Sequence, residues 1–296
     1  MKWQGRRGSS NVRSSKGGGK MIGGGIGGII IAGILWLVFG VNPMTALQTG
    51  QMVAGGGNNG TSTEVATSTD RDTQFVKVVL ADTEEVWHQI FNEVGSTYQE
   101  PSLILFNGQV SSACGSATAA TGPFYCPGDQ SIYLDTSFFA DMRQNLGITG
   151  DQQGSGDDEN QGKAGDFAQA YVISHEVGHH VQTLLGITQQ VNEASRQVTQ
   201  AQANKLSVLQ ELQADCFAGV WAQRNQARVQ FLEAGDVDEA INAASQIGDD
   251  RLAKARGGAV VPDNFTHGTS QQRVQWFTRG LESGNIQLCD TFSGAL

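Results

Sequence analysis

The chain has 296 residues, of which 39% are hydrophobic, and its formal net charge is −10. This length suffices for one large domain or two small ones. The charge is uneven: residues 1–42 contain six basic residues and no acidic ones, so the remainder has 13 basic and 29 acidic residues. An acidic body argues against nucleic acid as a partner, because such binding depends on contacts with phosphates.

The segment 21–41 (MIGGGIGGIIIAGILWLVFGV) contains no charged side chain. About 20 apolar residues in a helix cross a hydrocarbon layer of about 30 Å, and basic residues that precede such a helix stay in the cytoplasm. We therefore predict a basic cytoplasmic tail over 1–20, one transmembrane helix over 21–42, and a main domain that is periplasmic or extracellular. The alternative is a cleaved signal peptide, for which Ala46 is the only nearby candidate. The Gly-rich spacing of the segment would permit self-association of anchors.

After this segment the composition changes twice. Residues 43–70 are rich in Gly, Asn, Thr and Ser, which predicts a flexible linker. A folded domain is expected over 71–296. Near its start, Asp82 is followed three residues later by Glu85, a pattern typical of a helix that begins at Asp82.

The apolar patterns in the rest of the domain predict an α+β fold that is mainly helical, with a small β-sheet. Apolar runs at 101–106 and 131–135 are bounded by turn residues and predict strands. We interpret 131–135 as an edge strand that could pair with an extended peptide, although an interior strand fits equally well. Helical periodicity is expected over 166–186, 189–227, 236–255 and from Thr269 onward.

The four cysteines suggest disulfides, because the domain is expected outside the cytoplasm. Three pairings are open. We favour Cys114–Cys126, which closes a short loop, and Cys216–Cys289, which joins a predicted helix to the C-terminal region. The acidic, Gly-rich stretch 147–165 is expected to be a surface insertion.

The most informative motif is His175-Glu176-x-x-His179, which lies in the predicted helix 166–186. Residues four apart share one face of a helix, so the two imidazoles can bind one metal ion. Zinc is the expected ion, because it accepts histidine nitrogens, and Glu176 would act on water at the metal.

A third ligand is expected from the predicted helix 189–227. Glu211 and Asp215 are also four residues apart and therefore share a face. Glu211 would complete an open site of two histidines and one carboxylate, which is typical of catalytic zinc. Asp215 would accept a hydrogen bond from a ligating imidazole. Each motif alone occurs by chance in unrelated helices, whereas the two together are much more specific.

Several stretches of the chain resemble the neutral zinc metallopeptidase family of bacteria, whose members are single-pass membrane proteins. A more distant similarity is to the gluzincin membrane peptidases. The matching stretches lie within residues 71–296 and are FVKVVLADTE (75–84), GPFYCP (122–127), GDFAQAYVISHEVGHHVQ (165–182), ELQADCFAGVW (211–221) and THGTSQQR (266–273).

The resemblance implies a zincin-like metallopeptidase domain. By that resemblance His175, His179 and Glu211 bind Zn²⁺, Glu176 is the catalytic base, and Asp215 supports a ligand.

Two further residues are predicted to be catalytic because the distant gluzincins carry a His and an Arg at a similar spacing. These are His267, just before the last predicted helix, and Arg273 inside it. Either could stabilise the oxyanion of a tetrahedral intermediate. The alternative for Arg273 is an ion pair with a buried acid.

The expected function is hydrolysis of peptide bonds in a protein or peptide by a membrane-anchored zinc metalloendopeptidase. A zinc-activated water would attack the carbonyl, with Glu176 as general base. The alternative is a catalytically inactive zinc-binding scaffold or binding protein of the envelope.

Overall fold

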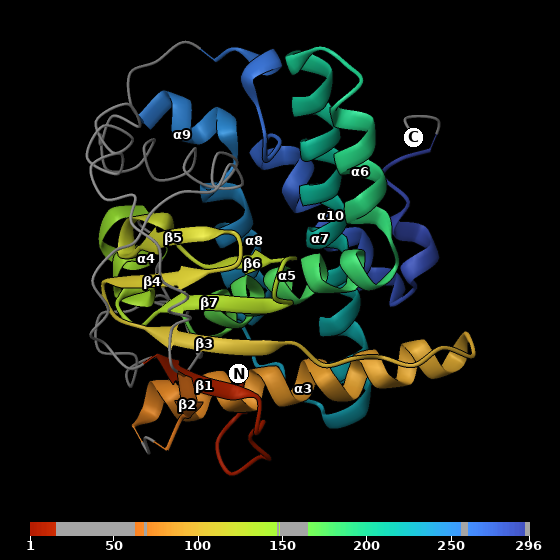
Figure 1. Cartoon of the computed structure of the whole chain (residues 1–296). Coiled ribbons are helices and arrows are strands. Elements are labelled where there is room, and N and C mark those ends of the chain that lie inside the picture. The colour runs from red at the N-terminus through yellow and green to blue at the C-terminus, as the bar shows by residue number, and fades with distance from the viewer. Residues whose placement is uncertain (16–62, 68–69, 147, 149–164, 256–259, 294–296) are drawn as a thin grey trace.

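The computed structural model describes residues 1–15, 63–67, 70–146, 148, 165–255 and 260–293 (Figure 1). The predicted anchor 21–42, most of the linker 43–70 and most of the insertion 147–165 lie outside the described residues. Over the part of the chain that is described, no helix has the length and apolar character that a membrane crossing requires.

A five-stranded sheet and a separate two-stranded hairpin form the β part of the fold. The sheet has the order β2-β1-β3-β7-β6, and its strands are Val12–Ser15 (β1), Thr63–Val65 (β2), Ser102–Phe106 (β3), Phe124–Cys126 (β6) and Ser131–Asp135 (β7). The hairpin consists of Gln109–Ser112 (β4) and Gly115–Thr118 (β5).

The edge of the sheet differs from the one we predicted. The strand β7 is parallel to β3 on one side and antiparallel to β6 on the other, so it is an interior strand. All of its residues are buried, which explains its nearly continuous apolar character. The two edge strands are β2 and β6, and β6 lies close to helix α5 (Asp166–Leu184).

Helices make up most of the remaining structure, as the mainly helical α+β prediction required. Besides α5 they are α3 (Arg71–Glu93), α4 (Phe138–Leu146), α6 (Ile187–Ser195), α7 (Gln200–Val229), α8 (Asp236–Gln246), α9 (Asp249–Ala255) and α10 (Ser270–Ser283). In Figure 1, α3 runs along the β1 side of the sheet, whereas α6, α7 and α10 lie beside one another. Helix α7 packs against both α5 and α10.

The N-terminal residues belong to the folded domain, whereas the sequence predicted a separate tail over 1–20 and a domain beginning near residue 71. Strand β1 lies between β2 and β3, with Val12 fully buried. Trp3 packs edge-on against Phe75 of α3, with 5.4 Å between ring centroids. The apolar residues of this basic segment therefore attach residues 1–15 to the core.

Helix α3 begins eleven residues before the predicted start, because Asp70 rather than Asp82 caps it by accepting a hydrogen bond from the backbone N–H of Thr73. Asp82 is instead buried within the helix and forms ion pairs with Arg6 at 2.5 Å and Arg228 at 2.7 Å. Asp82 is therefore a buried carboxylate that pairs with two half-buried arginines, and it does not cap a helix.

The predicted helix 189–227 is two helices, because Thr199 starts α7 with a reciprocal capping box to Gln202. The predicted helix 236–255 is likewise divided at Gly248, where a Cβ atom would collide with the backbone of Ser270. The capping box that begins α10 at Thr269 is confirmed.

Both predicted disulfides are confirmed. Cys114–Cys126 joins the loop of the β4–β5 hairpin to β6, and Cys216–Cys289 joins α7 to a short C-terminal turn. Their Cα–Cα distances are 5.7 and 5.6 Å, within the usual range.

The crossing of α7 and α10 depends on two glycines. A Cβ atom at Gly219 would collide with the carbonyl oxygen of Phe277, and one at Gly280 would collide with that of Cys216. The two helix backbones can therefore come close together, which brings the start of α10 next to the acidic face of α7.

Candidate metal centre

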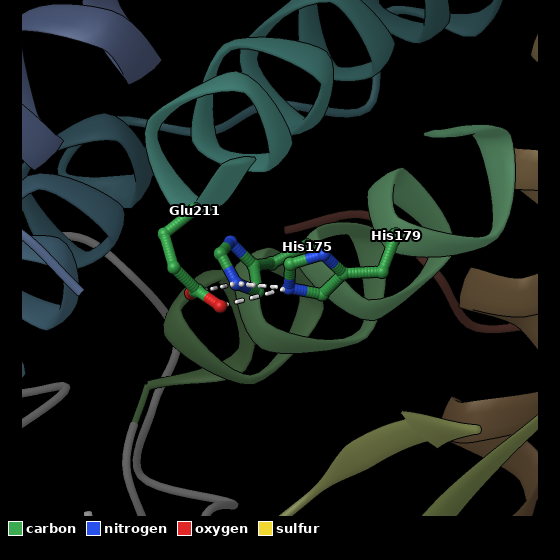
Figure 2. Close-up of side chains that lie close together, drawn as sticks. All are labelled: His175, His179 and Glu211. Carbon is green, nitrogen blue, oxygen red and sulfur yellow. Dashed lines mark hydrogen bonds and ion pairs between the residues drawn. The ribbon is translucent and has the colours of Figure 1, made fainter. Parts of the chain in front are cut away.

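Three predicted ligands come together between α5 and α7. The Nε2 atoms of His175 and His179 are 3.2 Å apart, and the Glu211 carboxylate lies 3.2 Å from the first and 3.5 Å from the second (Figure 2). Four zinc ligands at about 2.05 Å in a tetrahedral arrangement would be about 3.3 Å from one another. The spacing therefore fits a single zinc ion.

The hydrogen bonds of the two imidazoles support the same conclusion. His175 Nδ1 lies 2.9 Å from Asp215 Oδ1, and His179 Nδ1 lies 2.9 Å from Gln182 Oε1. With Nδ1–H donating in each ring, both neutral imidazoles direct the Nε2 lone pair into the same space. Two lone pairs beside a carboxylate repel one another unless a cation lies between them.

The pKa values of His175 and Glu211 also indicate that the site favours a positive charge. Burial alone would lower the pKa of His175, but Asp215 and Glu211 raise it to about 9. Without a metal ion this imidazole therefore also holds a proton on Nε2 at neutral pH, and metal binding would release that proton. Burial alone would raise the pKa of Glu211, but His179 and His175 hold it well below its usual range. The carboxylate is therefore ionised, as a metal ligand must be.

Glu176 lies beside the first ligand on α5 and is almost fully buried. Burial raises its pKa, and the nearby His179 and His175 partly offset that increase. Among the residues that the structure describes, none donates a hydrogen bond to this carboxylate. Glu176 is therefore free to accept a proton at the site.

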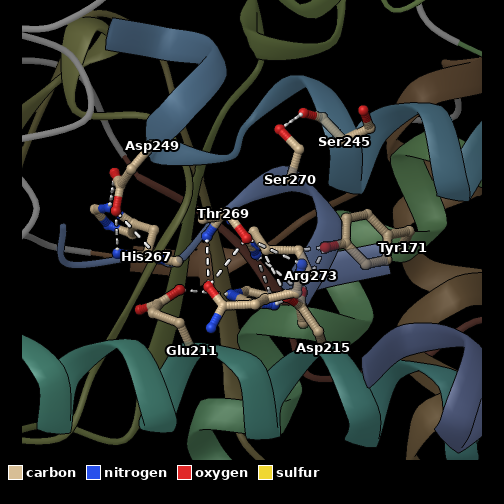
Figure 3. A network of polar contacts seen from close by, with 12 residues as sticks. Tyr171, Glu211, Asp215, Ser245, Asp249, His267, Thr269, Ser270 and Arg273 are labelled. Carbon is tan, nitrogen blue, oxygen red and sulfur yellow. Dashed lines mark hydrogen bonds and ion pairs between the residues drawn. The ribbon is translucent and has the colours of Figure 1, made fainter. Parts of the chain in front are cut away.

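Asp215 is fully buried behind the first ligand. One carboxylate oxygen accepts hydrogen bonds from His175 Nδ1, from the hydroxyl of Tyr171 and from Arg273 Nη2, and the other accepts from Arg273 Nε at 2.8 Å (Figure 3). Burial alone would raise the pKa of Asp215, but Arg273 and His175 hold it below its usual range. The arrangement fixes the tautomer of His175, as predicted for Asp215.

Arg273 faces Asp215 with both its Nε and Nη2 atoms and is only 2% exposed. Its Nη2 atom also lies 3.5 Å from His175 Nδ1, which is the ring nitrogen that does not face the ligand Glu211. This geometry favours the second of our two interpretations, an ion pair with a buried acid.

His267 is held by Asp249, the first residue of α9 (Figure 3). One carboxylate oxygen accepts the backbone N–H groups of Thr266, His267 and Gly268, and the other lies 3.2 Å from His267 Nδ1. The imidazole lies near enough to Glu211 to lower the pKa of that carboxyl. His267 is thus a positioned imidazole beside the candidate metal site.

Sequence reasoning missed two residues of this site. Asp249 lies 18 positions before His267, and no periodicity connects the two. Gln182, in contrast, follows His179 by three positions on the same helix, and such neighbours lie side by side.

A second group of acidic side chains is occupied by the chain itself. Asp166, Asp236 and Glu239 lie close enough together to bind a cation. The amino group of Met1 donates to Asp166 at 2.6 Å and to Asp236 at 3.2 Å, and Glu239 accepts the backbone N–H of Phe167. The Met1 amino group already places a cation among these carboxylates, so we assign no metal to the group.

Comparison with known proteins identifies the family of this chain. The family described as "Putative neutral zinc metallopeptidase" matches residues 1–155 and 157–292. This chain belongs to that family. The "Uncharacterized protein YpfJ" of Escherichia coli (strain K12) is 45% identical over 307 residues, which cover 100% of both chains. The "Uncharacterized protein Rv2575" of Mycobacterium tuberculosis (strain H37Rv) is 39% identical over 67% of this chain and 64% of its own length. No solved structure matches the chain.

Proposed function

We propose that this member of the family is a zinc-dependent metalloendopeptidase with a zincin-like catalytic domain. The observation that carries the proposal is the convergence of His175, His179 and Glu211 beside the Glu176 carboxylate, to which none of the described residues donates a hydrogen bond. Zinc held by these ligands would lower the pKa of a water molecule and polarise the scissile carbonyl.

The residues of the chain supply the remaining steps. Glu176 accepts a proton from the attacking water and returns it to the leaving amine, for which its burial and raised pKa are suitable. His267, with Nδ1–H directed to Asp249, would in its doubly protonated form donate Nε2–H to the oxygen that becomes negatively charged in the tetrahedral intermediate. Asp215 and Arg273 keep His175 in the tautomer that presents Nε2.

The substrate would lie along β6. This strand is the edge of the sheet nearest to α5, and the side of it away from β7 has no strand partner among the described residues. An extended peptide could form backbone hydrogen bonds with that edge. The Cys114–Cys126 disulfide attaches β6 to the β4–β5 hairpin and would hold the edge in place.

We also propose that the domain lies outside the cytoplasm at the cell membrane, because it has two disulfides and a charge-free segment at 21–41. Ser15 of β1 pairs with Thr63 of β2, so the chain leaves and re-enters the sheet at neighbouring positions. A single crossing between them would put β1 and the domain on opposite sides, which is incompatible with β1 in the sheet. We therefore infer that residues 1–15 lie on the same side as the domain.

Labelling in intact cells tests this arrangement. The chain has no free cysteine among the described residues, so single cysteines can be introduced at exposed Ser10 and Gln271. A membrane-impermeant maleimide should label both. Labelling of Gln271→Cys without Ser10→Cys would show a single crossing and would refute the docked position of β1.

The hydrolytic function is tested by Glu176→Gln. A general base typically contributes about 10²–10⁴-fold to the rate, so peptide hydrolysis should fall by that factor while the zinc content stays unchanged. Glu282→Gln is the matched control, because Glu282 is exposed on α10. Full activity of Glu176→Gln would refute the assigned base. Wild-type protein that binds zinc but hydrolyses no peptide would support the scaffold alternative instead.

A further inference from the structure

The two histidine ligands have supports of different chemistry. His175 donates to the Asp215 carboxylate, whereas His179 Nδ1 faces the neutral amide of Gln182. An amide has an oxygen that accepts hydrogen bonds and a nitrogen that donates them. The support of His179 therefore depends on which way the Gln182 amide is turned.

The neighbours of Gln182 determine that orientation. Its Nε2 atom lies 2.7 Å from the backbone oxygen of Gln210, which can only accept. The same nitrogen lies 3.1 Å from Gln213 Oε1. With the nitrogen directed to these two acceptors, Oε1 faces His179 and accepts its Nδ1–H. The lone pair of His179 Nε2 is thereby directed at the metal site.

Gln213 has a fixed orientation for a similar reason. Its Nε2 atom lies 3.0 Å from the backbone oxygen of Cys289, so its Oε1 is the atom that faces Gln182. Gln182 and Gln213 are both buried, where an unpaired amide is costly. A continuous hydrogen-bond chain therefore runs from His179 through two amides to the carbonyl of Cys289.

The last acceptor in this series of hydrogen bonds is the Cys289 carbonyl. The Cys216–Cys289 disulfide joins Cys289 to α7. Two residues later, the hydroxyl of Thr291 donates to the backbone oxygen of Leu209, also on α7, at 2.7 Å. The disulfide thus holds the carbonyl of Cys289 opposite Gln213. Gln213 lies on α7, the helix that also carries Glu211.

We propose that Gln182 and Gln213 are positioning residues for His179, and that the Cys216–Cys289 disulfide supports this ligand through them. The inference rests on the zinc site proposed above. Loss of the disulfide frees the Cys289 carbonyl and removes the acceptor that orients Gln213. The Gln210 oxygen alone then holds the Gln182 amide. The amide turns its nitrogen towards His179 in a larger fraction of molecules, which favours the tautomer with the proton on Nε2 and weakens metal binding.

Zinc affinity, measured by competition with a chromophoric chelator, is the first test. Loss of a residue that orients a ligand typically costs about 10–100-fold in metal affinity, so we expect a loss in this range for Gln182→Leu and Gln213→Leu. The double variant Cys216→Ala/Cys289→Ala should also bind zinc more weakly. The control is Cys114→Ala/Cys126→Ala, which removes the other disulfide and should bind zinc with wild-type affinity.

A combination of variants distinguishes this chain of contacts from general loosening of the fold. If the disulfide acts through Gln213, adding Gln213→Leu to the Cys216→Ala/Cys289→Ala pair should cause no further loss of affinity. Wild-type affinity in the disulfide variant, equal losses for the two disulfides, or additive losses would each overturn the proposal.

A second readout does not require zinc at all. The ¹⁵N chemical shifts of the His179 imidazole in metal-free protein report which nitrogen carries the proton. We expect Nδ1–H in the wild type and a shift towards Nε2–H in Gln182→Leu and in the disulfide variant, each first shown to be folded. An unchanged tautomer would overturn the proposal even if the wild type failed to bind zinc, whereas failed zinc binding with the expected tautomers would refute only the proposed function.

Discussion

Removal of Arg273 gives the sharpest test of the network behind the candidate zinc site. The Asp215 carboxylate is fully buried and accepts from Arg273 Nε at 2.8 Å and Nη2 at 2.9 Å. Among the described residues, Arg273→Met leaves that carboxylate with His175 and Tyr171 as its hydrogen-bond partners. Removing one partner of a buried ion pair typically costs about 3–5 kcal/mol, because the other charge remains buried.

The expected loss is large enough for thermal unfolding to measure. For a domain of about 150–250 residues, 1 kcal/mol corresponds to about 2–4 °C in Tm, so Arg273→Met should lower the Tm of metal-free protein by about 6–20 °C. Adding Asp215→Asn removes the stranded charge and should restore part of the loss. Arg279→Met is the control, because Arg279 lies exposed on the same helix and contacts only the face of Trp276 among described aromatic rings.

The two interpretations of Arg273 predict opposite results. An arginine that stabilises the oxyanion would lower kcat when replaced and leave the Tm of metal-free protein nearly unchanged. A wild-type Tm in Arg273→Met, or no recovery on adding Asp215→Asn, would refute the assignment of Arg273 as the partner of a buried carboxylate.

Three further predictions concern the metal, His267 and pH. Chelation should lower the Tm and added zinc should restore it, by about 2.7 kcal/mol when free zinc is 100 times its Kd; a Tm that ignores chelator would contradict the site. His267→Asn should lower kcat by about 10²–10³-fold with unchanged zinc content, whereas a loss of zinc would assign His267 to metal binding. Burial alone would lower the pKa of the Met1 amino group, but Asp166 and Asp236 raise it from 8.0 to about 10. That contribution, at most about 2–3 kcal/mol, should be complete below pH 8 and disappear as the pH rises to about 10; unfolding of N-terminally acetylated protein should lack this pH dependence.

The sequence predicted best what depends on a single helix. Two pairs of residues spaced four apart identified the faces of α5 and α7 that meet at the site, because helical periodicity is local. The chemistry of zinc then linked the two pairs, although no sequence pattern shows that α5 packs against α7. Helix crossing depends on contacts such as those of Gly219 and Gly280, which are far apart in the sequence.

The sequence predicted element boundaries poorly where distant segments compete with local signals. Asp82 and Glu85 form a capping pattern, but Asp82 lies inside a longer helix, where it is buried and pairs with the half-buried Arg6 and Arg228. The same cause explains why β1 belongs to the sheet, whereas the sequence predicted a separate tail: a basic segment before an apolar run looks like a cytoplasmic flank. Trp3 and Val12 of this segment are buried in the folded domain. Neither the ion pairs of Asp82 nor the burial of these two residues can be seen in the neighbouring sequence.

The direction of the hydrogen bonds is even harder to predict from the sequence. Spacing shows that Gln182 can reach His179, but not whether it presents an oxygen or a nitrogen. That orientation follows from Gln210 and Gln213, and the orientation of Gln213 follows from the carbonyl of Cys289. Each amide nitrogen donates to a backbone oxygen, of Gln210 or of Cys289, and every residue type carries such an oxygen, so side-chain identity alone does not encode the orientation. A metal ligand can therefore be found from the sequence, whereas the tautomer that makes it a ligand requires the fold.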